Sequence, residues 1–488
     1  MQKINDLGYR VPFLMRRLVI TYVLILTGVI FSIGQNQKDE NQKSPNIIVV
    51  LVDDLGYADV GFNGCEDIPT PNIDKIAAEG VKFTNAYVSY AVCGPSRAGL
   101  ITGRYQDRFG FGRNPLFAPN DPNMGLPLTE ETLAEALKKG NYKSVALGKW
   151  HLGAHKTQRP LERGFDDFFG FLSGGHNYFP EMWSLENEYE VKKQFDAYKT
   201  KLLKNNTRVE ESEYLTDALT REAVNYIEKY KAQPFFMYLA YNAPHSPLQA
   251  TEKYLQRFES IRDDKRKTYA AMVSAVDDGV GSILNKLDEL NLTGNTIVWF
   301  LSDNGGPEKR NASNNGILRG GKSDLFEGGI RVPFAMKWPK KFPTGKVYDN
   351  AVISLDIFAT VIAQTKTQIN PKNKLDGVNL IPYLTGEKSG SPHDFLFWRK
   401  FDKSNYAVRN ASGDKIIGLK DKLKMYNLDS NISEDPRVML NDKSLEESLN
   451  IQYETWNTQM IDPVFLGLLS DGEYNELHPN RFKRKKQN

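Results

Sequence analysis

Cysteine is nearly absent from this chain, because only Cys65 and Cys93 occur among 488 residues. A framework of several disulfides is therefore excluded as the source of stability. The two cysteines could pair with each other, but a single bridge would add little to a fold of this size. The length and the 11% aromatic content allow a large hydrophobic core. We expect one large domain that carries a smaller second one, folded throughout.

An excess of charge of one sign is also absent, since 63 Lys and Arg face 60 Asp and Glu. This balance argues against a surface built to hold a nucleic-acid backbone, so any preference for anions must be local. One basic run, residues 481–486, lies at the C-terminus. We interpret it as a solvated tail, with capture of an acidic polymer as the alternative.

An apolar run near the N-terminus, residues 18–33, is short for a membrane span. Arg16 and Arg17 precede it, and a polar, Lys-rich stretch follows it at residues 35–43. This order is typical of an export signal. We predict a signal peptide at residues 1–34 and a polar linker at residues 35–44. The mature protein is then periplasmic or secreted, without stable membrane association.

The remaining sequence alternates between buried strands and helices. Apolar, β-branched or aromatic runs predict parallel strands at residues 46–52, 142–147, 235–241 and 296–301. Helical periodicity appears between them, as at residues 133–138 and 269–290. This alternation predicts an α/β fold, with a large sheet sandwiched by helices, as the catalytic domain at residues 45–384.

The character of the chain changes after Leu384. A Gly, Ser and Pro linker at residues 385–392 is followed by short strand-like pieces separated by turns. These pieces are residues 395–399, 406–409, 415–419 and 423–428. We predict a smaller antiparallel-sheet subdomain of the α+β type at residues 385–488. We expect a helix at residues 445–456 to cover this sheet. The basic tail forms the end of the subdomain.

Each predicted parallel strand is followed by side chains that can bind a metal or an anion. The four groups are Asp53 and Asp54, Lys149 and His151, His245, and Asp303 and Asn304. Because ligands of open α/β sheets bind beyond the carboxyl ends of the strands, we expect these groups to meet at one edge. The oxygen donors favour a hard cation, calcium first and magnesium second. The alternative is that each pair is an ordinary turn.

Cys93 lies in the sequence Ala91-Val92-Cys93-Gly94-Pro95-Ser96-Arg97, directly before a helix-compatible stretch. A nucleophile at a helix N-terminus gains from the backbone N–H groups and from the helix dipole. A thiolate there could attack a substrate, whereas a small buried cysteine would be inert. Histidine is scarce, with six in the chain, and His151 and His245 both follow strands. Arg97, Lys149 and Lys322 could surround a tetrahedral anion.

These motifs resemble the type I, formylglycine-dependent sulfatases of the alkaline phosphatase superfamily. Cys93 to Arg97 fits the Cys-x-Pro-Ser-Arg signature of that family, and Gly148 to His151 fits its Gly-Lys-Trp-His motif. The resemblance is close over residues 45–339 and includes further segments in the same order. These segments are Pro45 to Asn46, Asp53 to Gly56, Thr70 to Asp74, Ala243 to His245, Ser302 to Gly305 and Gly320 to Lys322.

The resemblance implies that a maturation enzyme oxidises Cys93 to formylglycine (3-oxoalanine). One hydroxyl of the hydrated aldehyde then attacks sulfur, and the second hydroxyl later expels sulfate. Carried over by position, the cation ligands are Asp53, Asp54, Asp303, Asn304 and the modified Cys93. Arg97 and Lys149 hold the hydrate, and His151 takes a proton during expulsion. His245 and Lys322 grip sulfate oxygens, and one of them protonates the leaving oxygen.

The resemblance also implies a substrate class, because similar bacterial enzymes desulfate polysaccharides such as ulvan, carrageenan or glycosaminoglycans. The loop at residues 173–179 is rich in side chains suited to sugars, with His and Asn for hydroxyl groups and aromatic rings for stacking. We predict that His176 and Tyr178 of this loop bind the sugar. A packed structural loop is the alternative. Two other functions are considered: a formylglycine-dependent phosphonate or phosphate ester hydrolase, and a carbohydrate-binding relative without catalysis.

Overall fold

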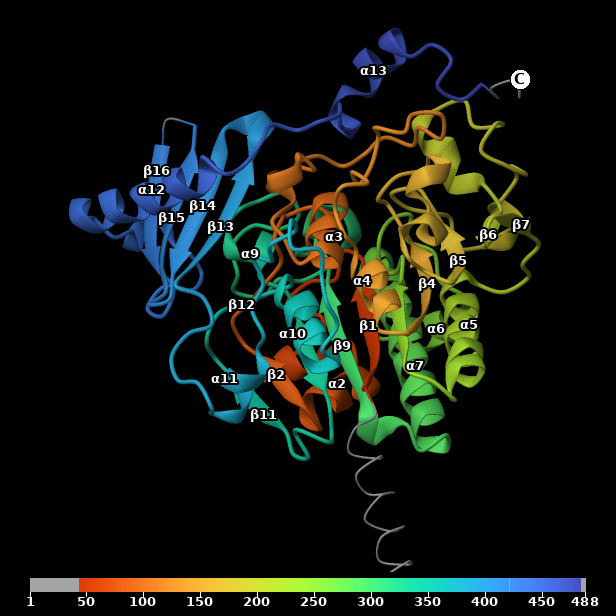
Figure 1. The fold of residues 1–488 in the computed structure, drawn as a ribbon, viewed down its shortest axis with the longest axis horizontal. Helices are drawn as coiled ribbons and strands as arrows, with labels where there is room; N and C mark the ends of the chain where they lie inside the picture. Colours follow the sequence, from red (N-terminus) through yellow and green to blue (C-terminus); the bar gives the residue numbers. More distant parts are fainter. Residues whose placement is uncertain (1–43, 421, 484–488) are drawn as a thin grey trace, which may run out of the picture. The chain divides into compact units, whose positions relative to one another are not determined.

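The computed structural model describes residues 44–420 and 422–483, and the predicted signal peptide therefore lies outside the described residues. Residues 45–488 form one compact unit (Figure 1). Within the described ranges, no helix has the length and apolar character needed to cross a membrane. The predicted boundary at residue 384 remains a prediction, because the C-terminal sheet belongs to the same unit.

The large sheet has ten strands in the order β11-β2-β10-β9-β1-β8-β4-β5-β6-β7. Its parallel centre consists of β9 (Thr296–Ser302), β1 (Asn46–Val52), β8 (Phe235–Ala240), β4 (Lys143–Lys149) and β5 (Asp167–Phe171). Antiparallel pairs occur toward both edges, so the sheet is mixed. The outer strands are β2 (Val81–Phe83), β10 (Phe334–Lys337), β11 (Lys346–Tyr348), β6 (Leu202–Lys204) and β7 (Thr207–Val209). The predicted large sheet is confirmed.

Helices cover both faces of this sheet because its central strands are apolar on both sides. Along β1, Ile47, Val49 and Leu51 enter one core, and the alternating residues enter the other. The first core is shared with α3 (Cys93–Thr102), α4 (Leu133–Lys139) and α10 (Asp356–Thr365). The second core is shared with α2 (Pro71–Ala78), α5 (Leu215–Tyr230) and α7 (Asp264–Glu289). Short elements complete this part: β3 (Ala86–Tyr87), β12 (Val352–Ile353), α6 (Glu252–Leu255), α8 (Glu308–Asn311), α9 (Glu327–Ile330) and α11 (Ile381–Thr385).

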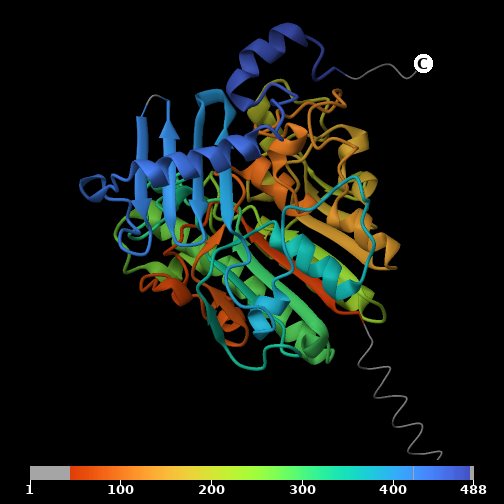
Figure 2. The same ribbon diagram turned by 60° about the vertical axis from the view of Figure 1, so that its left-hand side comes forward.

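The C-terminal part contains the predicted antiparallel sheet. Its strands are β13 (Phe395–Lys400), β14 (Asn405–Asn410), β15 (Asp414–Leu419) and β16 (Lys422–Asn427), paired in sequence order. Helix α12 (Lys443–Asn457) lies across the strands (Figure 2). Tyr453 of α12 stacks on Tyr406, with ring centroids 4.1 Å apart. Tyr87 and Tyr105 of the large domain join the same core, which fixes the small sheet to the large one.

The last segment differs from the predicted solvated tail. The chain after α12 returns over the large domain, where the backbone amide of Leu468 donates to the carbonyl of Asn114 at 3.0 Å. It then forms α13 (Asp471–Leu477). The Arg481 guanidinium is buried, donates to the carbonyl of Phe117 at 2.9 Å and pairs with Asp471. Arg481 is therefore a structural residue, and residues 484–488 of the basic run lie outside the described part.

Candidate functional site

The carboxyl ends of β1, β9, β4 and β8 bring the four predicted groups together at one edge of the sheet. The backbone amide of Asp303 donates to the carbonyl of Val52 at 3.0 Å, and that of Asp53 donates to the carbonyl of Ala243 at 3.2 Å. These bonds extend the parallel pairing beyond the strand ends. The side chains that follow each strand therefore start from neighbouring positions, as the sequence predicts.

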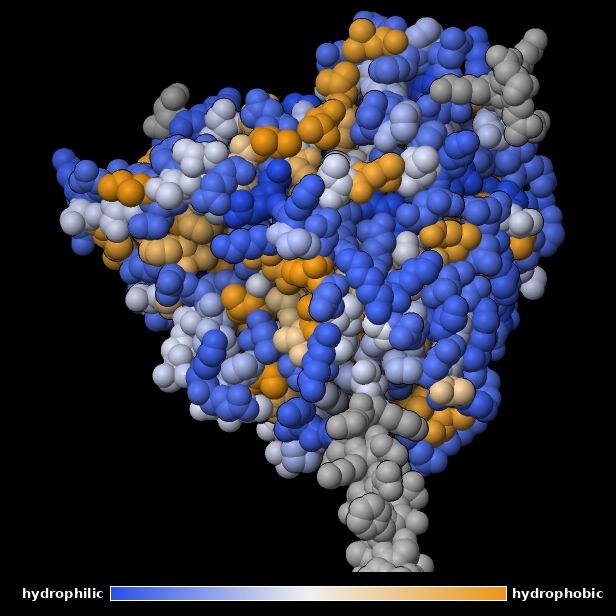
Figure 3. Space-filling model, viewed as in Figure 1, coloured by the Kyte–Doolittle hydropathy of each residue, from blue (hydrophilic) through white to orange (hydrophobic). Residues whose placement is uncertain are grey.

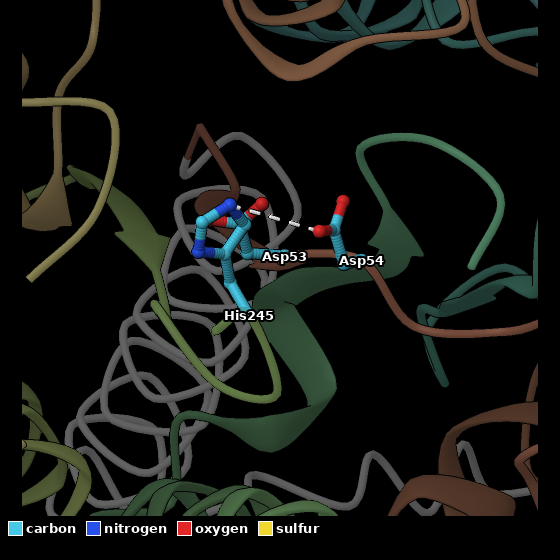
Figure 4. Close-up of side chains that lie close together, drawn as sticks. All are labelled: Asp53, Asp54 and His245. Carbon is cyan, nitrogen blue, oxygen red and sulfur yellow. Dashed lines mark ion pairs between the residues drawn. The ribbon is translucent and has the colours of Figure 1, made fainter. Parts of the chain in front are cut away.

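Three buried carboxylates form the centre of the site. Asp53, Asp54 and Asp303 are each at most 2% exposed. Figure 4 shows Asp53 and Asp54 beside His245, and the possible ligand atoms of these three residues lie within 4.8 Å of one another. The ligand atoms of Asp53, Cys93 and Asp303 meet the same condition. The geometry thus places the thiol and the carboxylates around one point.

A basic side chain faces each carboxylate. The ammonium nitrogen of Lys149 lies 2.5 Å from Asp53, and that of Lys322 lies 2.7 Å from Asp54. Arg97 is fully buried and donates to Asp303 through two nitrogens, at 2.7 and 2.9 Å. Buried carboxylates need such partners, because an uncompensated charge in the interior is costly.

The buried carboxylates of the cluster can accept one more positive charge. Burial raises the pKa of Asp53 to about 7, and the nearby Asp303 acts in the same direction. Burial would also raise the pKa of Asp54, but Lys322 and His245 outweigh it and lower that pKa. The oxygens Asp53 Oδ1 and Asn304 Oδ1 are buried and have no hydrogen-bond partner among the described residues. Unsatisfied carboxylate and amide oxygens fit a divalent cation that prefers oxygen.

Cys93 begins α3, as the sequence predicts for a nucleophile at a helix N-terminus. Its side chain is 2% exposed, and its sulfur lies 3.6 Å from Asn114 Oδ1. The same oxygen accepts a hydrogen bond from the Gly94 amide at 2.8 Å, and a Cβ at Gly94 would come equally close to it. Cys65 and Cys93 are both free, so they form no disulfide with each other.

The two predicted histidines reach the cluster as neutral rings. Burial lowers the pKa of His151 and of His245 well below the usual value. His245 Nδ1 lies 2.6 Å from the Ser246 carbonyl, which can only accept, so Nδ1 carries the hydrogen. Its Nε2 atom faces Asp54 at 3.7 Å. His151 Nδ1 is buried and unpartnered among the described residues.

Two site residues adopt a left-handed backbone conformation, Asp54 with φ of 65° and His151 with φ of 57°. Residues other than glycine are uncommon in this region, and such conformations gather at functional sites. Here the conformation occurs directly after β1 and β4, where the chain leaves the sheet. The side chains of Asp54 and His151, which have this backbone conformation, both belong to the cluster.

Two further residues of the site were not predicted from the sequence. Asn114 is the neighbour of Cys93 described above. Tyr198, from the 3-10 helix Gln194–Lys199, is partly buried. Burial raises its pKa, and the charge of Cys93 is the next largest cause. A Cβ at Gly174 would lie 2.7 Å from the His151 ring, and one at Gly175 equally close to the Tyr198 hydroxyl. The Gly-Gly pair at residues 174 and 175 is the signal that could have indicated this packing.

The structure gives His176 and Tyr178 other partners than a sugar. His176 is fully buried, with Nε2 2.7 Å from the Thr200 carbonyl and Nδ1 2.9 Å from the Asn177 carbonyl. The buried Tyr178 hydroxyl donates to the carbonyl of His245 at 2.7 Å. Both side chains are buried and have polar partners within the protein, which favours the alternative of a packed structural loop. Tyr178 instead holds the backbone of His245.

Comparison with known proteins agrees with this geometry. The family model described as "Sulfatase" matches residues 45–367. An uncharacterized sulfatase, YdeN of Escherichia coli, is 33% identical over 76% of this chain and 71% of its own. The human N-acetylgalactosamine-6-sulfatase is 34% identical over 70% of this chain and 66% of its own. The crystal structure of Ps i-CgsB has 39% identity and a TM-score of 0.82, and the match covers 90% of this chain and 98% of the other.

Proposed function

Because the chain belongs to the sulfatase family, we propose that it removes sulfate from a sulfated carbohydrate at the cluster around Cys93. The observation that carries this proposal is the meeting of Cys93 with three buried carboxylates, each faced by a basic side chain. The charged groups come from separate strand ends, from α3 and from the loop that carries Lys322, so distant parts of the chain are needed to assemble them. Such fixed charges stabilise a transition state that spreads negative charge over sulfuryl oxygens.

The cation in this proposal is calcium, with magnesium as the second choice. Asp53, Asp54, Asp303 and Asn304 would hold it together with the modified Cys93. When bound, the cation supplies positive charge to the sulfate and to the nucleophile. The unpartnered Asp53 and Asn304 oxygens support this assignment.

The nucleophile in this proposal comes from Cys93 after a maturation enzyme has converted it to formylglycine, which supplies hydroxyl groups when hydrated. Arg97 and Lys149 orient the residue at position 93. Arg97 donates to the Lys149 carbonyl at 3.1 Å, so the two basic residues hold each other in place. His151 accepts a proton near position 93, and its neutral ring suits this task.

Lys322 and His245 bind the sulfate oxygens in this proposal. Both contact the carboxylate of Asp54, Lys322 at 2.7 Å and His245 at 3.7 Å. His245 can donate from Nε2 only when this nitrogen also carries a proton, and in that state either His245 or Lys322 returns a proton to the leaving sugar oxygen.

The substrate class follows from the relatives. One similar structure, 38% identical with a TM-score of 0.82, is Ps i-CgsB in complex with "k-i-k-neocarrahexaose". The human relative is named for a sulfated N-acetylgalactosamine. These names support a sulfated polysaccharide or its oligosaccharides as substrate. The export signal predicted at residues 1–34 would deliver the enzyme to the periplasm or outside the cell, where such polymers occur.

Rates on paired aryl esters test the proposed reaction. The matured protein is expected to hydrolyse 4-nitrophenyl sulfate faster than 4-nitrophenyl phosphate or a phenylphosphonate ester. The Cys93→Ala protein serves as the background control. A higher kcat/KM for phosphate or phosphonate would instead assign the chain to the phosphorus ester hydrolases. Turnover of none of these esters, with sulfated glycan still bound, would indicate a binding protein.

A further inference from the structure

A cleft of about 720 Å³ opens beside the candidate site. Lys322 and Asn114 line it, and both belong to the cluster around Cys93. The cleft is therefore continuous with the place where the scissile sulfate would bind. Its volume lies within the range of about 300 to 1,000 Å³ that is usual for ligand pockets.

The walls of the cleft come from distant parts of the chain. They include the residues around α8, the loop that carries Lys322, the turn after β13, and the segment after α12. Figure 1 shows the last segment passing from the small sheet over the large domain to α13. Leu469 of this segment is 89% exposed at the cleft, which offers an apolar face beside the polar walls.

Positive charge exceeds negative charge along these walls. Apart from Lys322, the basic residues are Arg113, Lys309, Arg310, Lys400 and Lys403. The acidic residues are Glu308, Asp324 and Asp402. Five basic groups thus face three acidic ones, whereas the whole chain is almost balanced. The face of the molecule drawn in Figure 3 is largely hydrophilic, with apolar residues interspersed.

The acidic residues of the cleft leave a net positive charge on its walls, and one of them forms an ion pair with a basic residue of the cleft. Asp402 pairs with Arg113 at 2.5 Å. Glu308 and Asp324 instead accept hydrogen bonds from backbone amides, those of Asn315 and Gly321. Lys309, Arg310 and Lys403 are exposed and form no ion pair with any described residue. The ammonium of Lys400 donates to the Ser323 carbonyl next to Lys322.

We propose that this cleft binds a second anionic group of the glycan, a sulfate ester or carboxylate on a sugar beyond the one that loses its sulfate. Lys403 and Arg310 are its principal contacts. The proposal deepens the proposed function and rests on it, because it makes the substrate a polyanionic oligosaccharide. Unpaired cations in a cleft next to an anion-binding site are complementary to such a chain, and Arg and Lys bind sulfate and carboxylate oxygens directly.

Binding of sulfated hexasaccharides to the matured, full-length protein tests this proposal by calorimetry. The probes are carrageenan, chondroitin sulfate and ulvan hexasaccharides, a neutral agarose hexasaccharide, and galactose 6-sulfate as the single-anion reference. At least one sulfated hexasaccharide is expected to bind about tenfold more tightly than galactose 6-sulfate. Lys403→Glu and Arg310→Glu should each weaken that binding by about tenfold, and added salt should weaken it further.

Lys443→Glu is the matched control, because Lys443 is exposed at the start of α12 and does not line the cleft. It should leave the Kd within about twofold of wild type, and thermal melting checks the fold of each variant. The proposal is overturned if neither cleft variant changes the Kd, if Lys443→Glu weakens binding equally, or if no sulfated hexasaccharide exceeds galactose 6-sulfate. Failure of the proposed function would appear separately, as absent aryl sulfatase activity in the wild type.

Discussion

At the scale of single residues, Cys93 combines a central place in the site with few contacts that support the fold. Its sulfur lies 3.6 Å from Asn114 Oδ1. Cys93→Ala should therefore lower kcat on 4-nitrophenyl sulfate by about 10⁴-fold or more, since no other group can replace the nucleophile. The cost in unfolding free energy should stay near 1 kcal/mol. Near-wild-type turnover in this variant, measured beside its melting curve, would refute the assignment.

His176 is expected to act through the fold. Its buried ring lies between the carbonyls of Asn177 and Thr200. The side-chain amide of Asn242, which follows β8, donates to the backbone carbonyl of His176 at 3.0 Å. His176→Ala should lower the free energy of unfolding by about 2 kcal/mol. It should also reduce activity on an aryl sulfate and on a sulfated oligosaccharide by the same factor. A loss confined to the oligosaccharide would restore a direct role in sugar binding.

The residues that the sequence did not place correctly share one property. His176, Tyr178 and Arg481 are polar and lie in irregular segments, where polar side chains usually face solvent. Their burial depends on distant partners, such as Phe117 for Arg481 and His245 for Tyr178. Local sequence carries no information on such pairings. The proximity of Tyr198 to Cys93 was missed for the same reason.

At the scale of elements, the site depends on the ends of β1 and β9, which supply Asp53, Asp54, Asp303 and Asn304. Purified protein should contain calcium, and a calcium concentration about 100 times the Kd should raise the free energy of unfolding by about 2.7 kcal/mol. Asp303→Asn removes one carboxylate and should shrink this stabilisation, whereas the exposed Glu447→Gln should not. Stoichiometric zinc, with activity restored by zinc alone, would contradict the assignment.

The strands could be predicted well because their runs of apolar residues are fully buried on both faces. The predicted strand at residues 46–52 coincides with β1, and the other three predicted strands differ from β4, β8 and β9 by one or two residues at their ends. The parallel strand β5 was not predicted. The outer strands β2, β6, β7, β10 and β11 were not predicted. They are three or four residues long, so their sequences carry too little periodicity to be distinguished from loops.

A buried ionic group joins the small sheet to the large domain and should respond to pH. Lys415 of β15 lies 2.8 Å from both Glu327 and Glu434. Burial raises the pKa of Glu434 to about 7 from its ordinary value of 4.5. The folded protein therefore keeps a proton that the unfolded chain releases. The stabilisation from this proton is complete below about pH 4.5 and is lost as pH rises through about 7.

The variant Glu434→Gln should weaken this dependence, because it cannot ionise. Between pH 5 and pH 8.5, the wild type should lose about 1 to 3 kcal/mol of unfolding free energy more than the variant. Urea unfolding at the two pH values measures the difference. Glu447→Gln on α12 is the control and should keep the wild-type slope. Parallel slopes for Glu434→Gln and the wild type would contradict the raised pKa.

At the scale of the whole molecule, the near-balance of charge predicts that any preference for anions is local. The surplus of basic groups lines the cleft beside Lys322, although the residues that form it lie far apart in the sequence. Their convergence depends on the returning segment after α12 and on the small sheet. This is why the sequence could indicate the catalytic cluster, whose motifs are contiguous, and could not indicate the cleft.

The mass of the peptide that contains Cys93 tests whether this residue becomes the formylglycine of a sulfatase. The protein should be produced together with a formylglycine-generating enzyme, and a sulfatase of known activity in the same cells should serve as the maturation control. We expect a peptide lighter than the thiol form, because one sulfur and two hydrogen atoms are replaced by one oxygen. A free thiol at Cys93, or a disulfide to Cys65, while the control sulfatase is fully converted, would contradict it.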